Sequence, residues 1–170
     1  MQDAVEKLNK VQTVAGRIEK ISDTNILAVV DYAHTPNALE TVLKALREHT
    51  ENNLICVFGC GGDRDSGKRS GMAKTAEANA DTVIVTNDNP RTENPQSIMD
   101  DIVAGFIHPS AVTIEHDRAT AIRMAIMQAK SGDTVLIAGK GHENYQILST
   151  GKIDFNDREE ANKALQELAA

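Results

Sequence analysis

Residues 54–91 have the sequence LICVFGCGGDRDSGKRSGMAKTAEANADTVIVTNDNPR, and the fold class follows from its pattern. Two runs within it, 54–58 and 82–85, are almost continuously apolar, which is typical of strands covered by helices on both faces of a sheet. A glycine-rich loop and a segment long enough for a helix separate the two runs. Because strand, helix and strand follow in this order, the stretch predicts a parallel βα unit.

The same alternation extends along the rest of the chain. Three further apolar runs predict strands at 26–30, 112–115 and 134–138. Residues 145–155 have the pattern of a hairpin. We therefore expect a three-layer α/β domain with a mostly parallel sheet of about six strands and a late antiparallel strand or hairpin.

Capping residues mark where the helices should begin. Thr35 and Asn94 each precede a proline, Asp117 precedes an apolar stripe, and together they predict helices at 36–50, 95–106 and 118–130. Asp157, followed by Glu160, predicts the cap of a last helix at 158–170.

Composition restricts the function classes. A chain of 170 residues with 41% hydrophobic content is long enough for one domain with its own core. The net charge of -7 argues against binding to nucleic acid or to an anionic membrane surface. We see no signal peptide and no apolar run approaching the roughly 20 residues that span a membrane. Cys56 and Cys60 lack a second ligand pair for zinc, so we expect two reduced thiols in a cytoplasmic protein.

Five unusual loops should meet at one edge of the sheet. They follow the predicted strands or their partners, at 31–36, 59–71, 87–95, 116–120 and 139–146. In open α/β sheets ligands bind beyond the carboxyl ends of the strands, so this edge is the expected binding site.

The glycine-rich loop at 59–71 has two interpretations. Its backbone amides could face an anion, but Lys68 is followed by Arg69, so the loop does not match a P-loop. It is either a ligand loop or a flexible turn. Arg64 either points into the site or pairs with the neighbouring Asp63 and Asp65 on the surface.

The loop at 87–95 contains the sequence DNPR. Pro90 fixes its own φ and biases Asn89 towards an extended backbone, which restricts where Asn89 and Arg91 can point. Arginine is the side chain best suited to bind a carboxylate by two parallel hydrogen bonds. The alternative is that Pro90 ends a strand and Arg91 is a solvated loop charge.

The loop at 139–146 supplies the opposite charge. Gly139 allows close approach of the backbone, and Glu143 should be a free carboxylate on the same edge. Arg91 and Glu143 together would suit a zwitterion. Lys140 and His142 are ambiguous, and we favour structural or orienting roles for both.

At the end of the first predicted strand, Asp31 could bind a ligand hydroxyl such as that of a ribose. His34 could be a general base or could simply brace the loop at the start of a helix.

Five motifs taken together resemble a known family. In chain order they are GRIE, VVDYAHTP, VFGCGGDRDSGKR, TNDNPRTENP and AGKGHENYQI. Their order and spacing closely resemble the C-terminal domain of the Mur ligases, specifically those that add meso-diaminopimelate to UDP-MurNAc-L-Ala-D-Glu in peptidoglycan synthesis. The resemblance covers residues 14–170. It implies a Rossmann-like fold for 13–170, with 1–12 as the tail of a preceding central domain and a linker.

The resemblance also implies ligands and partners. Family members bind ATP and Mg2+ mainly through the central domain, which carries the P-loop and a carbamylated lysine. No catalytic residue or metal ligand is therefore assigned in this chain, and we expect it to be inactive alone. The implied partners are meso-diaminopimelate, ATP and the UDP-MurNAc-dipeptide, with no nucleic acid and no membrane.

Site residues carry over from the matching motifs. The residues implied for meso-diaminopimelate are Arg64, Asp88, Asn89, Pro90, Arg91, Gly139 and Glu143; those implied for the nucleotide are Arg17, Asp31 and His34. Lysine-adding relatives differ at the arginine of DNPR. Ser66 and Ser70 depart from the usual Lys and Pro of the family loop. The competing hypotheses are a stand-alone α/β module that binds an amino acid or nucleotide, and a ligase for another amino acid.

Overall fold

The computed structural model describes residues 16–23 and 25–170. The tail and linker predicted at 1–12 lie outside the described residues. Within the described part, no helix is long and apolar enough to cross a membrane.

A six-stranded sheet forms the centre of the domain, in the order β1-β2-β6-β3-β4-β5. Its strands are β1 (Glu19–Asp23), β2 (Leu27–Asp31), β3 (Leu54–Phe58), β4 (Thr82–Val85), β5 (Thr113–Ile114) and β6 (Thr134–Ala138). All neighbouring pairs are parallel except β1 with β2. The carboxyl ends of the five parallel strands therefore meet at one edge, as the sequence predicted.

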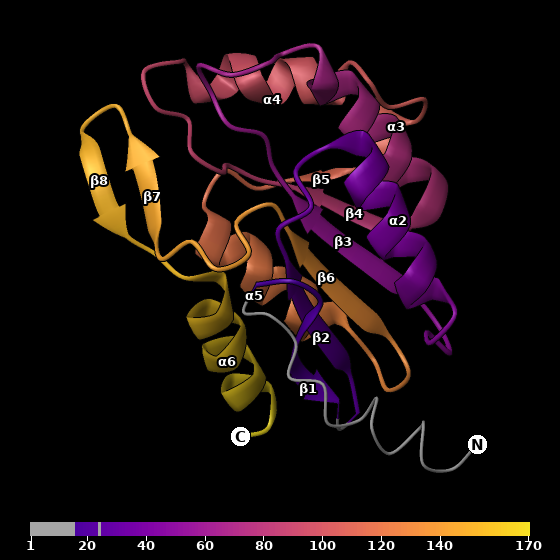
Figure 1. Cartoon of the computed structure of the whole chain (residues 1–170). Helices are drawn as coiled ribbons and strands as arrows, with labels where there is room; N and C mark the ends of the chain where they lie inside the picture. Colours follow the sequence, from indigo (N-terminus) through magenta and orange to yellow (C-terminus); the bar gives the residue numbers. More distant parts are fainter. Residues whose placement is uncertain (1–15, 24) are drawn as a thin grey trace, which may run out of the picture.

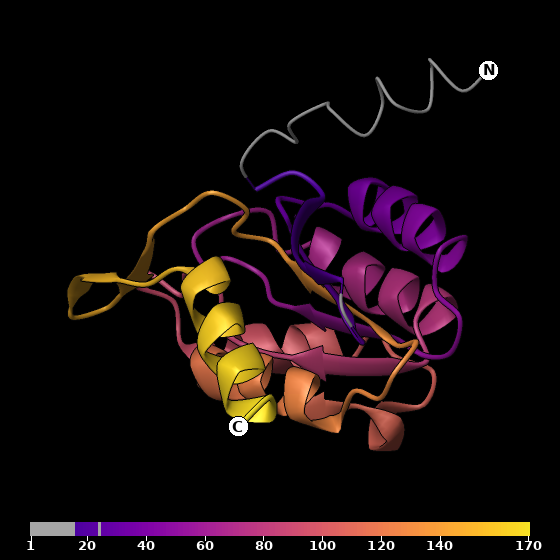
Figure 2. The same ribbon diagram turned by 90° about the horizontal axis from the view of Figure 1, so that it is seen from below.

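Helices cover both faces of the sheet (Figures 1 and 2). They are α2 (Pro36–Arg47), α3 (Lys68–Asn79), α4 (Pro95–Val103), α5 (Arg118–Gln128) and α6 (Asp157–Leu168), with a short 3-10 helix η1 at Pro109–Ala111. On β3, Cys56 and Phe58 pack with α2, α3 and α4, whereas Ile55 and Val57 pack with α5 and α6. This alternation confirms the predicted three layers.

The predicted hairpin is confirmed, but it stands apart from the main sheet. β7 (Tyr145–Leu148) and β8 (Gly151–Asp154) pair with each other and project beyond the sheet (Figure 1). The antiparallel member of the six-stranded sheet is instead β1, which was not predicted. Its sequence EKISD has no apolar run, and its partner is only the open edge of β2.

Three of the four predicted helix caps are confirmed. Thr35, Asn94 and Asp117 each accept a hydrogen bond from a backbone N–H in the first turn. These helices end at Arg47, Val103 and Gln128, two or three residues earlier than expected. The cap predicted at Asp157 is wrong, because Asn156 accepts from the first turn of α6.

Candidate functional site

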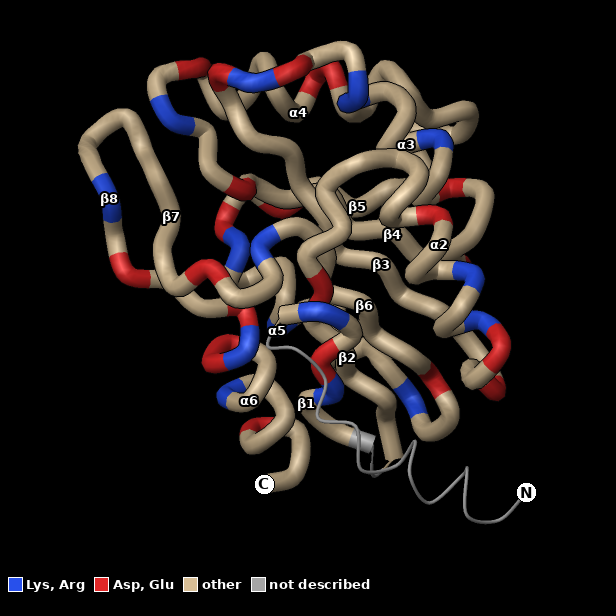
Figure 3. Tube along the Cα trace, in the orientation of Figure 1, with Lys and Arg blue, Asp and Glu red and all other residues tan. Residues whose placement is uncertain are grey.

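A cavity of about 370 Å³ lies at the carboxyl ends of the parallel strands. Four of the five predicted loops contribute to its wall, and charges of both signs lie along the loops near the β7–β8 hairpin (Figure 3). Predicted site residues that line it are His34, Arg64, Asp88, Asn89, Arg91, Gly139 and Glu143. Pro90, Arg17 and Asp31 are not part of the lining. The structure thus brings the two halves of the expected zwitterion site together.

The glycine-rich loop packs directly on the DNPR loop. A Cβ on Gly62 would lie 2.1 Å from the carbonyl oxygen of Pro90, and one on Gly59 would lie 2.2 Å from that of Thr86. The Gly62 N–H also donates to the Asn89 carbonyl at 2.9 Å. The glycines of this loop are therefore required for close backbone contact, and the loop forms a wall of the cavity rather than a free turn.

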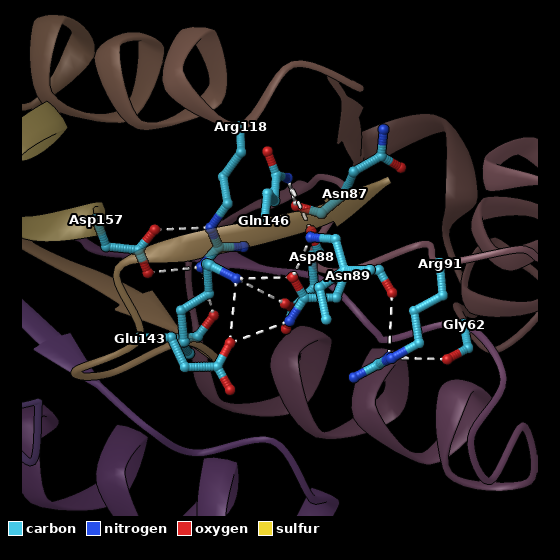
Figure 4. A network of polar contacts seen from close by, with 12 residues as sticks. Gly62, Asn87, Asp88, Asn89, Arg91, Arg118, Glu143, Gln146 and Asp157 are labelled. Carbon is cyan, nitrogen blue, oxygen red and sulfur yellow. Dashed lines mark hydrogen bonds and ion pairs between the residues drawn. The ribbon is translucent and has the colours of Figure 1, made fainter. Parts of the chain in front are cut away.

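Asp88, Asn89 and Glu143 point toward one another around the ammonium of Lys140 (Figure 4). Lys140 is fully buried, and its Nζ lies 3.1–3.3 Å from one oxygen of each of these side chains. Glu143 was expected to be a free carboxylate, and this is wrong, because its Oε2 also accepts from Asn89 Nδ2 at 3.0 Å. The reason is that a buried ammonium must be paired and hydrogen-bonded.

Arg91 is half-buried and held on its loop rather than solvated. Its Nη1 donates to the carbonyls of Gly62 at 2.8 Å and Asn89 at 3.2 Å. Its backbone has φ of 54°, in the left-handed region, and its N–H donates to Ile147 of β7. No described residue accepts from its Nε or Nη2, so one edge of the guanidinium stays available for a ligand.

Arg64 is exposed and lines the cavity beside Gly61, the glycine that Arg91 also approaches. Within the described part of the chain it forms no ion pair, and its one hydrogen bond, 3.5 Å long, goes to the carbonyl of Asp63. The predicted alternative, pairing with Asp63 or Asp65, is not formed. Asp63 accepts instead from Thr92, and Asp65 from the N–H of Gly67.

Arg69, which was not predicted, joins the two loops from behind. It is 1% exposed and donates to both oxygens of Glu93, to Asp101 and to the carbonyl of Gly61. The hydrogen bonds from Arg69 to Glu93, followed by one from the Asp63 N–H, lower the pKa of Glu93. In the sequence Arg69 is one of several charges beside glycines, and nothing local signals its burial.

A second buried ion pair lies behind Gly139. Arg118 donates to both carboxylate oxygens of Asp157, at 2.7 and 2.8 Å, and neither side chain is exposed (Figure 4). Its Nη2 also donates to the carbonyl of Ala138 at the end of β6. Burial alone would lower the pKa of Arg118, but the charge and hydrogen bonds of Asp157 raise it. The pair ties α5 and α6 to the end of β6, directly before Gly139, and the sequence did not predict it.

Of the residues predicted for a nucleotide, His34 lines the cavity, whereas Arg17 and Asp31 lie outside the lining, beside the lining residue Tyr32. Tyr32 is in ring contact with His34 and His142, at centroid distances of 4.7 and 5.7 Å, and the Arg17 guanidinium lies 5.8 Å from the same ring. Arg17 and His34 are exposed. Asp31 is buried, and its two oxygens accept from the N–H groups of Ile18 and Ala33, so they brace the backbone. Its contact with a ribose stays a prediction.

Among the described residues, this edge holds one thiol, that of Cys60, and no cluster of metal ligands. The described residues contain no group of three His, Cys, Asp or Glu side chains arranged to hold a metal ion. Cys56 and Cys60 are both free and buried, and burial raises the pKa of each thiol to about 12.

Comparison with known families gives a match over most of the domain. Residues 16–141 match the family described as Mur ligase, glutamate ligase domain. The UDP-N-acetylmuramoyl-L-alanyl-D-glutamate--2,6-diaminopimelate ligase of Prochlorococcus marinus (strain MIT 9313) is 57% identical over 91% of this chain. The ligase of the same name from Coxiella burnetii (strain RSA 493 / Nine Mile phase I) is 55% identical over 95% of this chain. The chain spans 32% and 33% of these two relatives, about a third of their length.

Solved structures agree with this match. A structure of a UDP-N-acetylmuramoyl-L-alanyl-D-glutamate--2,6-diaminopimelate ligase superposes with a TM-score of 0.89 at 45% identity, over 99% of this chain and 35% of that one. A bifunctional folylpolyglutamate synthase/dihydrofolate synthase from Yersinia pestis, 20% identical, shares the fold with a TM-score of 0.63 over 84% of this chain and 32% of that one. The chain therefore belongs to the Mur ligase family.

Proposed function

We propose that this chain is the amino-acid-binding C-terminal domain of an ATP-dependent ligase. The ligase would join meso-diaminopimelate to UDP-MurNAc-L-Ala-D-Glu by an amide bond in peptidoglycan synthesis. The names of the most similar relatives support the reaction. The observation that carries the proposal for this chain is a cavity lined by three carboxylates, Asp65, Asp88 and Glu143, and by the guanidinium groups of Arg64 and Arg91.

A zwitterionic amino acid fits this cavity by charge. Its carboxylate would bind the open edge of Arg91, where Nε and Nη2 can donate two parallel hydrogen bonds, with Arg64 as a second cation. An ammonium group would bind the carboxylates of Asp88 and Glu143. Gly139 has φ of 120°, and a Cβ added there would lie 3.1 Å from Asp88 Oδ2, so glycine keeps this part of the cavity open.

Discrimination against lysine would follow from the second carboxylate of diaminopimelate. Lysine lacks this group and would leave a guanidinium unpaired in a partly buried site. Sites built to bind a polar group reject analogues that lack it. The intact DNPR sequence is the reason to prefer diaminopimelate over another amino acid.

The rest of the reaction would take place where this domain meets the remainder of the ligase. ATP supplies the activation of the UDP-MurNAc-dipeptide carboxylate as an acyl phosphate. This domain would hold the amino acid so that its free amine replaces the phosphate, which lowers the entropic barrier to attack. Arg17, Asp31 and His34 would serve the nucleotide, and Mg2+ would be held mainly by the phosphates and by other parts of the ligase. Because ATP and the nucleotide-linked substrate are cytoplasmic, we place the enzyme there.

The proposal is tested by titrating the chain with meso-diaminopimelate while recording 1H–15N NMR spectra, with lysine as the control. We expect shifts of the Asn89, Arg91 and Gly139 resonances with diaminopimelate and a much weaker response to lysine. An equal response to both amino acids, or no response at these residues, would overturn the proposal. The second outcome would favour a stand-alone module with a different ligand.

A further inference from the structure

We propose that Lys140 is a positioning residue that decides which atoms of Asp88, Asn89 and Glu143 face the amino acid. The inference rests on the proposed function and adds a residue that does not itself line the cavity. Lys140 has no exposed surface, and its ammonium lies behind the three side chains that do line the cavity. It therefore acts on a ligand only through them.

The orientation of the Asn89 amide follows from the chemistry of its neighbours. Its Oδ1 receives Lys140 Nζ at 3.1 Å and the Ile147 N–H at 2.9 Å, and both of these groups can only donate. Its Nδ2 faces Glu143 Oε2 at 3.0 Å, which accepts. With both lone pairs of Oδ1 used, the amide has one N–H left, so Asn89 can offer a ligand only a donor.

In each of the two carboxylates, Asp88 and Glu143, one oxygen likewise contacts Lys140 and the other does not. Lys140 binds Asp88 Oδ1 at 3.3 Å and Glu143 Oε2 at 3.2 Å. No described residue donates to Asp88 Oδ2 or Glu143 Oε1, although both residues line the cavity. The inner oxygens are thus occupied by Lys140, and the outer oxygens are available as acceptors for an ammonium group.

The net charge of the buried cluster around Lys140 also favours binding of an ammonium group. Lys140 and Arg118 contribute two positive charges, and Asp88, Glu143 and Asp157 contribute three negative ones, so the cluster carries one net negative charge. One ligand ammonium would neutralise it. Without Lys140, Asp88 and Glu143 would face each other with no cation between them, and repulsion would turn them away from this arrangement.

The test is Lys140→Met in a ligase of the relatives' length that carries this domain. Methionine fills a similar volume without charge. We expect KM for diaminopimelate to rise about 30-fold or more, as is typical when one partner of a buried charged contact is removed. KM for ATP and kcat at saturating diaminopimelate should change little. An unchanged KM for diaminopimelate would overturn the inference.

Two further variants separate positioning from filling of space. Lys74→Met, at an exposed position of α3, is the matched control and should leave all constants unchanged. Lys140→Gln restores a neutral donor behind the Asn89 oxygen and should recover part of the lost affinity. If the Met and Gln variants lose affinity equally while both stay folded, Lys140 acts only through packing, and the inference is wrong.

A measurement on the unsubstituted chain covers the case in which the variants do not fold. Its 1H–15N spectrum should contain a slowly exchanging Lys140 ammonium signal and one protected Nδ2 proton of Asn89. On titration with diaminopimelate the other Nδ2 proton should shift. A rapidly exchanging ammonium, or protection of neither amide proton, would overturn the inference. Failure of the wild-type enzyme to use diaminopimelate would instead reject the proposed function, so the two failures are distinguishable.

Discussion

The two ends of the cavity are built differently. At one end, Asp88, Asn89 and Glu143 all accept from a buried lysine, and Asn89 also donates to Glu143. At the other end, the lining residue His34 and the nearby Arg17, which is outside the lining, reach solvent around the ring of Tyr32.

The two ends differ in how far their side chains are ordered before a ligand binds. The networked end has fixed donors and acceptors before any ligand arrives, which suits a small amino acid because little side-chain ordering remains to be done on binding. The open end presents the exposed Arg17 and His34, whose described contacts here are with Tyr32 and not with a buried network. Under the proposed function, it would become a complete nucleotide site only against another surface of the ligase.

The largest effect is expected where the networked end is anchored. Asp157→Ala would leave Arg118 buried and without its counter-ion, so the free energy of unfolding should fall by about 3–5 kcal/mol. Urea denaturation measures this loss. Glu167→Ala, which removes the partner of the exposed Arg123, is the control and should cost far less, because exposed ion pairs contribute little to stability. Equal losses for the two variants would mean that the buried pair is not the anchor.

Next in size is the effect of removing the carboxylate-binding group. In a ligase carrying this domain, Arg91→Ala should lower kcat/KM for diaminopimelate about 100-fold, because a partly buried charged contact is lost. KM for ATP should be unaffected. Arg91→Lys keeps the positive charge but loses the two parallel donors of the guanidinium. Its kcat/KM for diaminopimelate should lie between those of Arg91→Ala and of the unsubstituted ligase. Steady-state kinetics with unchanged kcat and KM for diaminopimelate in Arg91→Ala would refute the assignment.

A smaller effect is expected at the ion pair between Arg69 and Glu93, which joins the glycine-rich loop to the DNPR loop. The Arg69 hydrogen bonds lower the folded-state pKa of Glu93 below its unfolded value of about 4.3, so Glu93 stabilises the fold fully above that pH. This stabilisation is lost as the pH falls through the lowered folded-state pKa. At pH 7, Glu93→Gln should reduce the free energy of unfolding by about 1–2 kcal/mol. Denaturation curves of the two proteins should converge in acid, and a constant difference at all pH values would contradict this account.

The smallest effect on the domain itself is expected at the open end. His34→Ala removes an exposed side chain, so stability and diaminopimelate binding should change by less than about 0.5 kcal/mol. KM for ATP in the ligase should rise. His49→Ala, at an exposed position after α2, is the control and should change neither. A loss of diaminopimelate affinity in His34→Ala would show that the two ends are not independent.

Local sequence patterns were enough to predict most of the fold. Continuous apolar runs identified β3, β4 and β6, and capping residues identified the starts of α2, α4 and α5. These features depend on neighbours within a few residues, so they can be recognised without the rest of the structure. The sequence could not identify β1 as a strand, because its pairing depends on the free edge of β2 rather than on its own composition.

The same distinction applies to the site. The sequence by itself determined that Arg91, Asn89 and Glu143 lie at one edge, because the carboxyl ends of parallel strands must meet there. Only the tertiary structure decided that Glu143 is paired, that Asp157 neutralises Arg118 and that Lys140 is buried among its acceptors. Asp157 and Arg118 are 39 residues apart, and Lys140 and Asp88 are 52 apart. Whether such a charge is solvated or buried depends on what the fold packs around it, and no local pattern contains that information.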